Sequence, residues 1–183
     1  MFLRVAIIFL FFSGVYAKAS AQNRIKWIAP SAAATKQNAP AKYYFLYFYY
    51  SDCKWCKHLE QTTFTDDYTA RFINQKFHAV KIDATTEDKV EFNQQTYKSV
   101  SVGKYDFNEL AVELLNGKMS FPAIVILDEK FNRIGVHQNY YNVDDFQMIM
   151  AYYAGGHYKT TLFRHYSNNY CKDSHFYNLV SDK

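Results

Sequence analysis

This chain of 183 residues has few cysteines, a small net charge and no long apolar segment. It has only three cysteines, and two of them form one motif while Cys171 is left over. The net charge is +4, with no strongly basic patch interleaved with aromatic residues, so we predict no binding of nucleic acid. No segment approaches the ~20 apolar residues that a membrane-spanning helix needs. No internal repeat is present, and the length fits one domain with extensions.

The N-terminus has the order of a secretory signal peptide. Arg4 precedes an apolar run of 11 residues at 5–15, and small residues follow up to Ala17 and Ala21. We therefore predict a signal peptide over residues 1–21, cleaved after Ala17 or Ala21; an uncleaved N-terminal anchor is the alternative. Removal of residues 1–21 would lower the net charge from +4 to +2, and the cleaved chain would have no stable membrane insertion. The chain would then work outside the cytoplasm, in a bacterial periplasm, where disulfides persist.

The most informative motif is Cys-Lys-Trp-Cys at residues 53–56. Before it, residues 43–49 are aromatic or aliphatic and favour a buried strand, and after it residues 57–61 favour a helix. The first cysteine therefore falls at a helix N-terminus, where exposed N–H groups and a partial positive charge favour a thiolate. This position suits disulfide exchange. A buried structural disulfide and half of a metal site are the alternatives.

The metal alternative needs ligands that the motif alone does not supply. Cys53, Cys56 and His58 provide three, and a structural zinc site needs a fourth, from Cys171 or His78. The remaining histidines show no spacing typical of a ligand set. We therefore predict no metal and no cofactor other than a redox-active Cys53–Cys56 disulfide.

The order of predicted elements indicates an α/β fold. Early strands connected through helices should pair in parallel, and a late hairpin should be antiparallel, giving a mixed central sheet with helices on both faces. The domain should span residues 22–163, followed by a polar, loosely attached tail at 164–183. The expected strands are 25–28, 43–49, 79–83, 123–127 and 133–136; the expected helices follow residue 53 and residue 66 and cover 86–97, 106–117 and 142–153. Asp106 and Asn142 are the expected caps of the last two helices, and Asn116-Gly117 should stop the helix at 106–117.

In this arrangement the sequence resembles the thioredoxin superfamily over residues 25–155. The shared features are the aromatic strand, the CxxC motif opening a helix, a strand ending in Lys81-Ile82-Asp83, and Phe121-Pro122 ahead of a strand and hairpin. The CxWCK form of the motif is similar to that of a secreted, thioredoxin-like branch. The resemblance implies a thioredoxin-like fold and a cis peptide bond before Pro122. It also implies that Phe121 and Pro122 lie beside the CxxC pair and bind substrate.

The chain departs from the family pattern in two ways. The separation of 66 residues between Cys56 and Pro122 is longer than in a minimal thioredoxin, and it contains the expected helix at 106–117. That inserted helix could cap the site and select substrates, or be an inert surface helix. In addition, many cytoplasmic thioredoxins have a buried acid nine residues before the first cysteine, and this chain has Tyr44 there. The proton acceptor of Cys56 is therefore left open, with Lys57, His58 and Glu60 nearby in sequence.

The motif predicts a mechanism of disulfide exchange. Cys53 would attack a substrate disulfide, and Cys56, one helical turn later, would resolve the mixed disulfide. The positive charges of Lys54 and Lys57 favour the thiolate and should lower the pKa of Cys53. Trp55 would offer an exposed apolar rim for substrate, or else pack on the domain.

The expected direction of exchange is reduction or isomerisation. Oxidising family members are associated with His before the second cysteine, and this chain has Trp55 there. The expected partners are protein thiols and disulfides and a membrane electron donor, and Cys171 is expected to be a tail thiol without a catalytic role. The competing hypothesis is a thioredoxin-fold binding module in which the CxxC pair is a structural disulfide.

Overall fold

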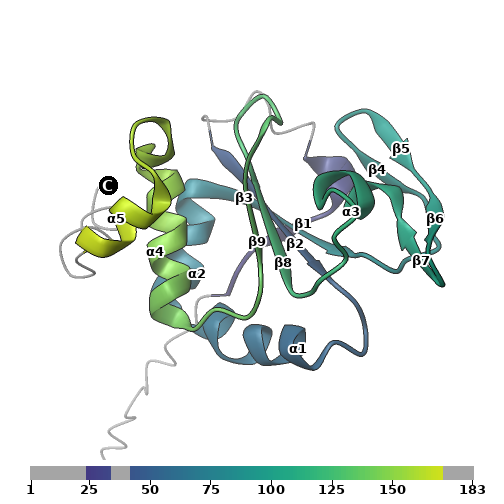
Figure 1. The fold of residues 1–183 in the computed structure, drawn as a ribbon, viewed down its shortest axis with the longest axis horizontal. Helices are drawn as coiled ribbons and strands as arrows, with labels where there is room; N and C mark the ends of the chain where they lie inside the picture. The colour runs from purple at the N-terminus through teal and green to yellow at the C-terminus, as the bar shows by residue number, and fades with distance from the viewer. Residues whose placement is uncertain (1–23, 34–41, 171–183) are drawn as a thin grey trace, which may run out of the picture.

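The computed structural model describes residues 24–33 and 42–170, which build a mixed five-stranded sheet (Figure 1). Its strands are β1 Trp27–Ile28, β2 Tyr43–Tyr49, β3 Phe77–Asp83, β8 Ala123–Leu127 and β9 Arg133–Gln138. They lie in the order β1-β3-β2-β8-β9. β3 is parallel to β1 and β2, whereas β8 is antiparallel to β2 and β9. The predicted mixed sheet, with an antiparallel hairpin at its end, is confirmed.

The two central strands are buried on both faces. Five of the seven residues of β2 and all five residues of β8 are buried. Continuous aromatic and β-branched runs suit such positions, because both faces of the strand are covered. The pairing of β2 with β3 continues to Tyr49 and Asp83, so both strands end at the same edge of the sheet. The residues that follow β2 are therefore delivered to that edge.

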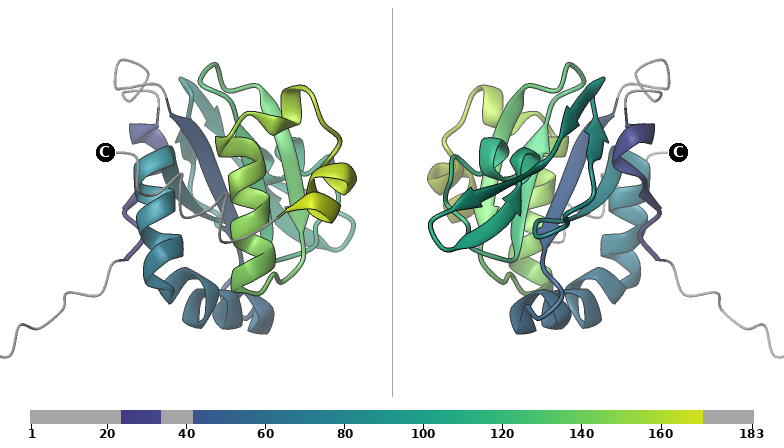
Figure 2. Two further views of the ribbon diagram at one scale, coloured as in Figure 1. Left: turned by 90° about the vertical axis from the view of Figure 1, so that its left-hand side faces the viewer. Right: turned by 90° about the vertical axis from the view of Figure 1, so that its right-hand side faces the viewer.

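One face of the sheet, here called the helical face, is covered by helices. The first is α1 Lys54–Gln61, which leads through the short η3 Thr63–Thr65 into α2 Asp67–Lys76, and α4 Val143–Ala154 lies beside α2 (Figure 2). The side chains beneath them are mainly aromatic. Phe146 of α4 has its ring centroid 5.8 Å from that of Phe45 and 5.5 Å from that of Phe64. These rings belong to one buried core with both cysteines of the CxxC motif.

The opposite face is covered mainly by the insert, defined as residues 84–122 between β3 and β8 (Figure 2). The insert consists of β4 Val90–Phe92, β5 Gln95–Tyr97, β6 Ser99–Val102, β7 Tyr105–Asn108 and α3 Glu109–Leu114. β4 pairs with β5 and β6 with β7, each pair antiparallel. A short 3-10 helix, η1 Pro30–Ala32, lies against β3 and β4 on the same side. Helical elements thus cover both faces, as predicted.

The predicted helix over residues 86–97 is wrong. These residues contain the β4–β5 hairpin, in which the two turn residues Asn93 and Gln94 have φ values of 47° and 64°. Two consecutive positive φ values are those of a type I′ turn, whose twist matches that of paired strands. Along β4 the side chains alternate, with Val90 and Phe92 buried and Glu91 exposed. The side chains of β4 therefore follow the period of two that is typical of a strand, and not the predicted helical period.

The inserted helix predicted at 106–117 forms only over Glu109–Leu114, and its predicted cap, Asp106, is wrong. Residues up to Asn108 belong to β7, and helix α3 is capped by Asn108, whose side chain accepts a hydrogen bond from the N–H of Leu110 at 3.1 Å. The Asp106 carboxylate instead accepts a hydrogen bond from the Ser101 hydroxyl at 2.6 Å across the β6–β7 hairpin. The predicted stop after the helix is confirmed, since Gly117 has a φ of 70°.

Asn108 holds the pieces of the insert together. Its side chain is fully buried, and its amide group donates to the carbonyls of Tyr97 and Asp88 at 3.4 and 3.5 Å. Its backbone N–H donates to the carbonyl of Ala84 at 2.8 Å. One polar residue therefore connects both hairpins, α3 and the end of β3.

The C-terminal part contains two elements beyond those predicted, η4 and α5. Helix α4 is capped by Asn142, as expected, and is followed by η4 His157–Lys159 and α5 Phe163–Asn169. Tyr166 of α5 is buried against Tyr152 of α4, with ring centroids 5.1 Å apart. Residues 164–170, expected to start a loose polar tail, thus pack on the domain. The predicted signal peptide at 1–21 and Cys171 lie outside the described residues.

Within residues 24–33 and 42–170, no helix has both the length and the apolar character that crossing a membrane requires.

Candidate active site

The CxxC motif lies between the end of β2 and the start of α1. After Tyr49 a turn brings the N–H of Cys53 to the carbonyl of Tyr50 at 3.1 Å, and α1 begins at the next residue. Cys53 is the N-cap of α1, and its sulfur accepts a hydrogen bond from the N–H of Cys56 at 3.0 Å. The two cysteines form a disulfide across the first turn of the helix. The predicted placement of the pair at a strand-to-helix junction is confirmed.

The two cysteines are buried, whereas the residues around them in the motif are exposed. Cys53 and Cys56 retain 2% and 1% of their accessible surface, and Trp55 retains 60%. Lys54 and Lys57 are exposed, and within the described part of the chain neither forms a salt bridge. Their positive charge is therefore unneutralised next to the first turn of α1, where the exposed N–H groups of the helix also favour negative charge.

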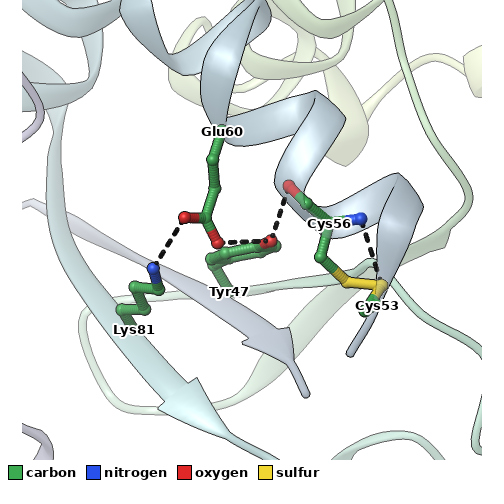
Figure 3. A network of polar contacts seen from close by, with 5 residues as sticks. All are labelled: Tyr47, Cys53, Cys56, Glu60 and Lys81. Atoms are coloured by element: carbon green, nitrogen blue, oxygen red, sulfur yellow. Dashed lines mark hydrogen bonds and ion pairs between the residues drawn. A yellow bond between two sulfur atoms is a disulfide. The ribbon is translucent and has the colours of Figure 1, made fainter. Parts of the chain in front are cut away.

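A polar network connects α1 to the sheet directly behind the disulfide (Figure 3). The buried Tyr47 hydroxyl lies 3.0 Å from Glu60 Oε1 and 3.4 Å from the carbonyl oxygen of Cys56. Glu60 Oε2 forms a salt bridge of 2.9 Å with Lys81 on β3. Lys81 Nζ also lies 4.4 Å from the ring centroid of Tyr49. The helix that carries Cys56 is thus fastened to β2 and β3 by three side chains.

Tyr47 acts in this network as a hydrogen-bond donor. Burial and the neighbouring Glu60 carboxylate both raise the pKa of Tyr47, so its hydroxyl keeps its proton at physiological pH. Glu60 was one of the residues considered as a proton acceptor for Cys56. The structure places its carboxylate against Tyr47 and Lys81, on the side of α1 that faces the sheet.

Phe121 and Pro122 lie on the opposite wall of the site, in the loop that enters β8. The peptide bond between them is cis. Together with Trp55 they line a groove of about 350 Å³, whose other walls are Asn139 and Tyr140. The three predicted substrate-binding residues are therefore brought together at one groove beside the disulfide.

Tyr140 is a residue of this groove that sequence reasoning missed. Its ring centroid lies 5.6 Å from that of Trp55 and 4.8 Å from that of His58. Trp55 is therefore exposed to solvent and also packs against Tyr140. Both predicted placements of Trp55, at an exposed rim and against the domain, apply in part. Tyr140 follows β9, far from the motif in sequence, and no local pattern links it to the cysteines.

The described residues do not bring together the ligands of the zinc alternative, of which Cys171 lies outside the described residues. The cysteines are joined to each other, and His58 packs against Tyr140. His78 is on β3, where it pairs with Tyr44 of β2. Across residues 24–33 and 42–170, no three His, Cys, Asp or Glu side chains are grouped so that they could hold a metal ion.

Comparison with protein families gives a match over most of the chain. Residues 11–139 match the model of Thioredox_DsbH, described as "Protein of unknown function, DUF255". No protein of curated function gives a significant match.

Two solved structures have a similar fold. A thioredoxin-fold protein from Helicobacter pylori is 17% identical, with a TM-score of 0.52 over 88% of this chain and 86% of its own. A thioredoxin from Thermus thermophilus is 18% identical, with a TM-score of 0.51 over 69% of this chain and 84% of its own. At this identity the similarity establishes the fold: the chain has a thioredoxin-like fold with a disulfide at the position of the CxxC motif.

Proposed function

This chain belongs to the Thioredox_DsbH family of thioredoxin-like proteins, and from that membership we propose that it is a thiol-disulfide oxidoreductase. The observation that carries the proposal is the Cys53–Cys56 disulfide across the first turn of α1, beside the groove of Trp55, Phe121 and Pro122. A disulfide confined to one helical turn closes a very short loop. It therefore constrains the unfolded chain little, which suits exchange better than stabilisation.

The reaction proceeds from the reduced protein. The Cys53 thiolate attacks one sulfur of a substrate disulfide, forming a mixed disulfide and releasing the other substrate sulfur as a thiolate. The Cys56 thiolate then attacks the Cys53 sulfur, re-forms the Cys53–Cys56 bond and releases the second substrate sulfur. The substrate gains two electrons and the protein dithiol loses them, so a dithiol donor must reduce the protein for each further turnover.

The surroundings of the pair support these roles. The helix N-terminus and the exposed charges of Lys54 and Lys57 stabilise the Cys53 thiolate. The salt bridge of Glu60 with Lys81 and the hydroxyl of Tyr47 hold the backbone of Cys56 in place for the resolving step. Glu60, Lys81 and Tyr47 are therefore positioning residues in this mechanism.

We further propose that the chain reduces or isomerises protein disulfides outside the cytoplasm. The N-terminal pattern of residues 1–21 supports export into a periplasm. The residue before the second cysteine, Trp55, supports reduction over oxidation. In an oxidising compartment the electrons would come from a membrane protein that presents a dithiol. Neither a metal nor an organic cofactor takes part in this scheme.

One observation favours a second function, a binding module with a structural disulfide. Both cysteines are almost completely buried, and a nucleophile must be reached by its substrate. In the oxidoreductase, the side chains that bury the Cys53 sulfur would have to move aside to admit the substrate. In a binding module those side chains would stay in place.

The reduction potential of the Cys53–Cys56 pair separates these functions. We expect equilibrium with dithiothreitol or glutathione, and a value at or below about −230 mV, as in reductases. A value between about −120 and −180 mV would instead identify an oxidant or isomerase. A pair that never equilibrates, and whose reduction destabilises the fold, would establish the binding module.

Replacement of the attacking cysteine gives the matched test. Cys53→Ser should abolish reduction of a model protein disulfide such as that of insulin, while Cys171→Ser should leave the rate unchanged. Activity retained by Cys53→Ser would refute the mechanism.

A further inference from the structure

A second cavity lies on the insert side of Phe121. It is a cleft of about 580 Å³ between the β6–β7 hairpin, the loop before Pro122 and the end of β2. Most of its lining is apolar or aromatic, chiefly Tyr50, Tyr105, Phe107, Met119 and Phe121. Phe121 also lines the groove beside the disulfide, so the cleft and the groove share one wall.

The aromatic residues of the cleft form a continuous series. The ring centroids are 5.6 Å apart for Tyr50 and Phe121, 6.1 Å for Phe121 and Phe107, and 6.4 Å for Phe107 and Tyr105. The outer member, Tyr105, is 59% exposed, and Tyr50, three residues before Cys53, is 37% exposed. An apolar surface therefore extends from the CxxC turn to the tip of an inserted hairpin.

The charge of the cleft limits what it can bind. Asp106 lines the cleft, and its carboxylate accepts a hydrogen bond from the Ser101 hydroxyl. Among the described residues that line it, there is no Lys, Arg or His. The Lys104 ammonium lies outside the lining, with its Nζ atom 5.1 Å from the ring centroid of Tyr105. Inside the cleft, the anionic groups of glutathione disulfide would meet the Asp106 carboxylate, whereas a neutral apolar side chain would gain contact with several aromatic rings.

We propose that this cleft binds a large apolar side chain of an extended protein segment, close in sequence to the cysteine whose disulfide is attacked. The inference rests on the proposed function, because it places the cysteine of that segment in the groove at Phe121. In an extended chain, side chains alternate in direction, so residues two positions from the cysteine point the same way as the cysteine does. The insert would thus select unfolded or flexible protein segments over small thiols.

The test compares disulfides in single-turnover oxidation of the reduced full-length chain. One substrate is a disulfide-linked peptide dimer with phenylalanine two positions before and after the cysteine; a second has aspartate at those positions; the third is glutathione disulfide. The second-order rate constant is measured by acid quench and thiol alkylation. We expect the phenylalanine peptide to react about tenfold faster than the other two, the factor that one good aromatic contact supplies.

Tyr105→Ala should remove most of that advantage while leaving the rate with glutathione disulfide within about twofold. Asp106→Asn, which keeps an acceptor for Ser101, should raise the rates with the two anionic substrates. The control is Tyr68→Ala, because Tyr68 is also an exposed tyrosine, 42% accessible, but lies on α2 on the helical face. It should change none of the rates.

Two failures can be told apart. Equal rates with all three disulfides, or a loss in Tyr105→Ala that is the same for all three, would overturn the selection by the cleft and leave the oxidoreductase function standing. A reduced chain that none of the disulfides oxidises would overturn the oxidoreductase function and this inference with it.

Discussion

The two faces of the sheet are built in different ways. On the helical face, long elements α2 and α4 cover interlocking aromatic rings, and the CxxC helix is fastened by the Tyr47–Glu60–Lys81 network. On the insert face, four strands of three or four residues and one short helix pack on the sheet through a second apolar core, and the buried amide of Asn108 connects their pieces. The difference indicates a division of tasks. The helical face fixes the position of the disulfide, and the insert shapes the surface beside it.

The largest expected effect is a difference in stability between the two faces. Phe146→Ala removes a fully buried ring and should lower the free energy of unfolding by about 3–5 kcal/mol. Asn108→Ala leaves buried carbonyls without donors and should cost about 1–3 kcal/mol. Urea denaturation measures both.

The same pair of variants tests whether the faces open separately. Hydrogen exchange in Asn108→Ala should accelerate within residues 88–114, with little change in α2 and α4. In Phe146→Ala it should accelerate throughout the described domain. Uniform acceleration in Asn108→Ala would show that the insert is an integral part of one cooperative unit.

A smaller effect, confined to the helical face, should appear on acidification. Burial lowers the pKa of His137 to about 4, and its Nε2 atom lies 2.9 Å from the Tyr153 hydroxyl. The unfolded chain therefore binds a proton near pH 6.5 that the folded chain takes up only near pH 4. Stability falls as the pH drops through this window, by about 1–2 kcal/mol between pH 7 and pH 5.

His137→Gln removes the titrating group and should flatten this slope, as measured by urea denaturation at a series of pH values. His165→Gln, on α5 and exposed, is the control that should keep it. An unchanged slope in His137→Gln would assign the acid sensitivity to other groups.

The smallest expected change in stability comes from the Glu60–Lys81 salt bridge that connects α1 to β3. Glu60→Gln keeps an acceptor for Tyr47 but loses the ion pair with Lys81, which is about one-third exposed. Because solvent screens such a pair, the cost should be about 0.5–1 kcal/mol, and Lys81→Met should cost the same. The double variant should be no worse than either single one. A loss above about 2 kcal/mol would show that the network supports the helix more strongly than its exposure suggests.

The parts of the fold that the sequence could predict are those with strong local patterns. The aromatic run of β2, the apolar run of β8 and the CxxC motif between strand and helix each occupy consecutive residues. The β4–β5 hairpin was missed because its strands are only three residues long and its turn is formed by Asn93 and Gln94 without a glycine. So short a segment cannot distinguish a period of two from a helical period.

The candidate site was predictable to the same degree. Trp55, Phe121 and Pro122 could be grouped because they belong to recognisable motifs. Tyr140 and the cleft around Tyr105 could not, since they reach the site only through the packing of separate elements. The role of Glu60 depended on which side of α1 faces the sheet, which the spacing within one helical turn does not decide.

The insert leaves the sheet and returns to it at the same edge as the disulfide. It starts at Ala84, whose N–H donates to the carbonyl of Tyr49 at 2.8 Å, and it ends at Pro122 before β8. Its loops and hairpin tips can therefore change in length without interrupting any strand of the sheet or moving either cysteine along the chain. In the laboratory the same boundaries, after Asp83 and before Phe121, mark where a foreign recognition loop could be grafted.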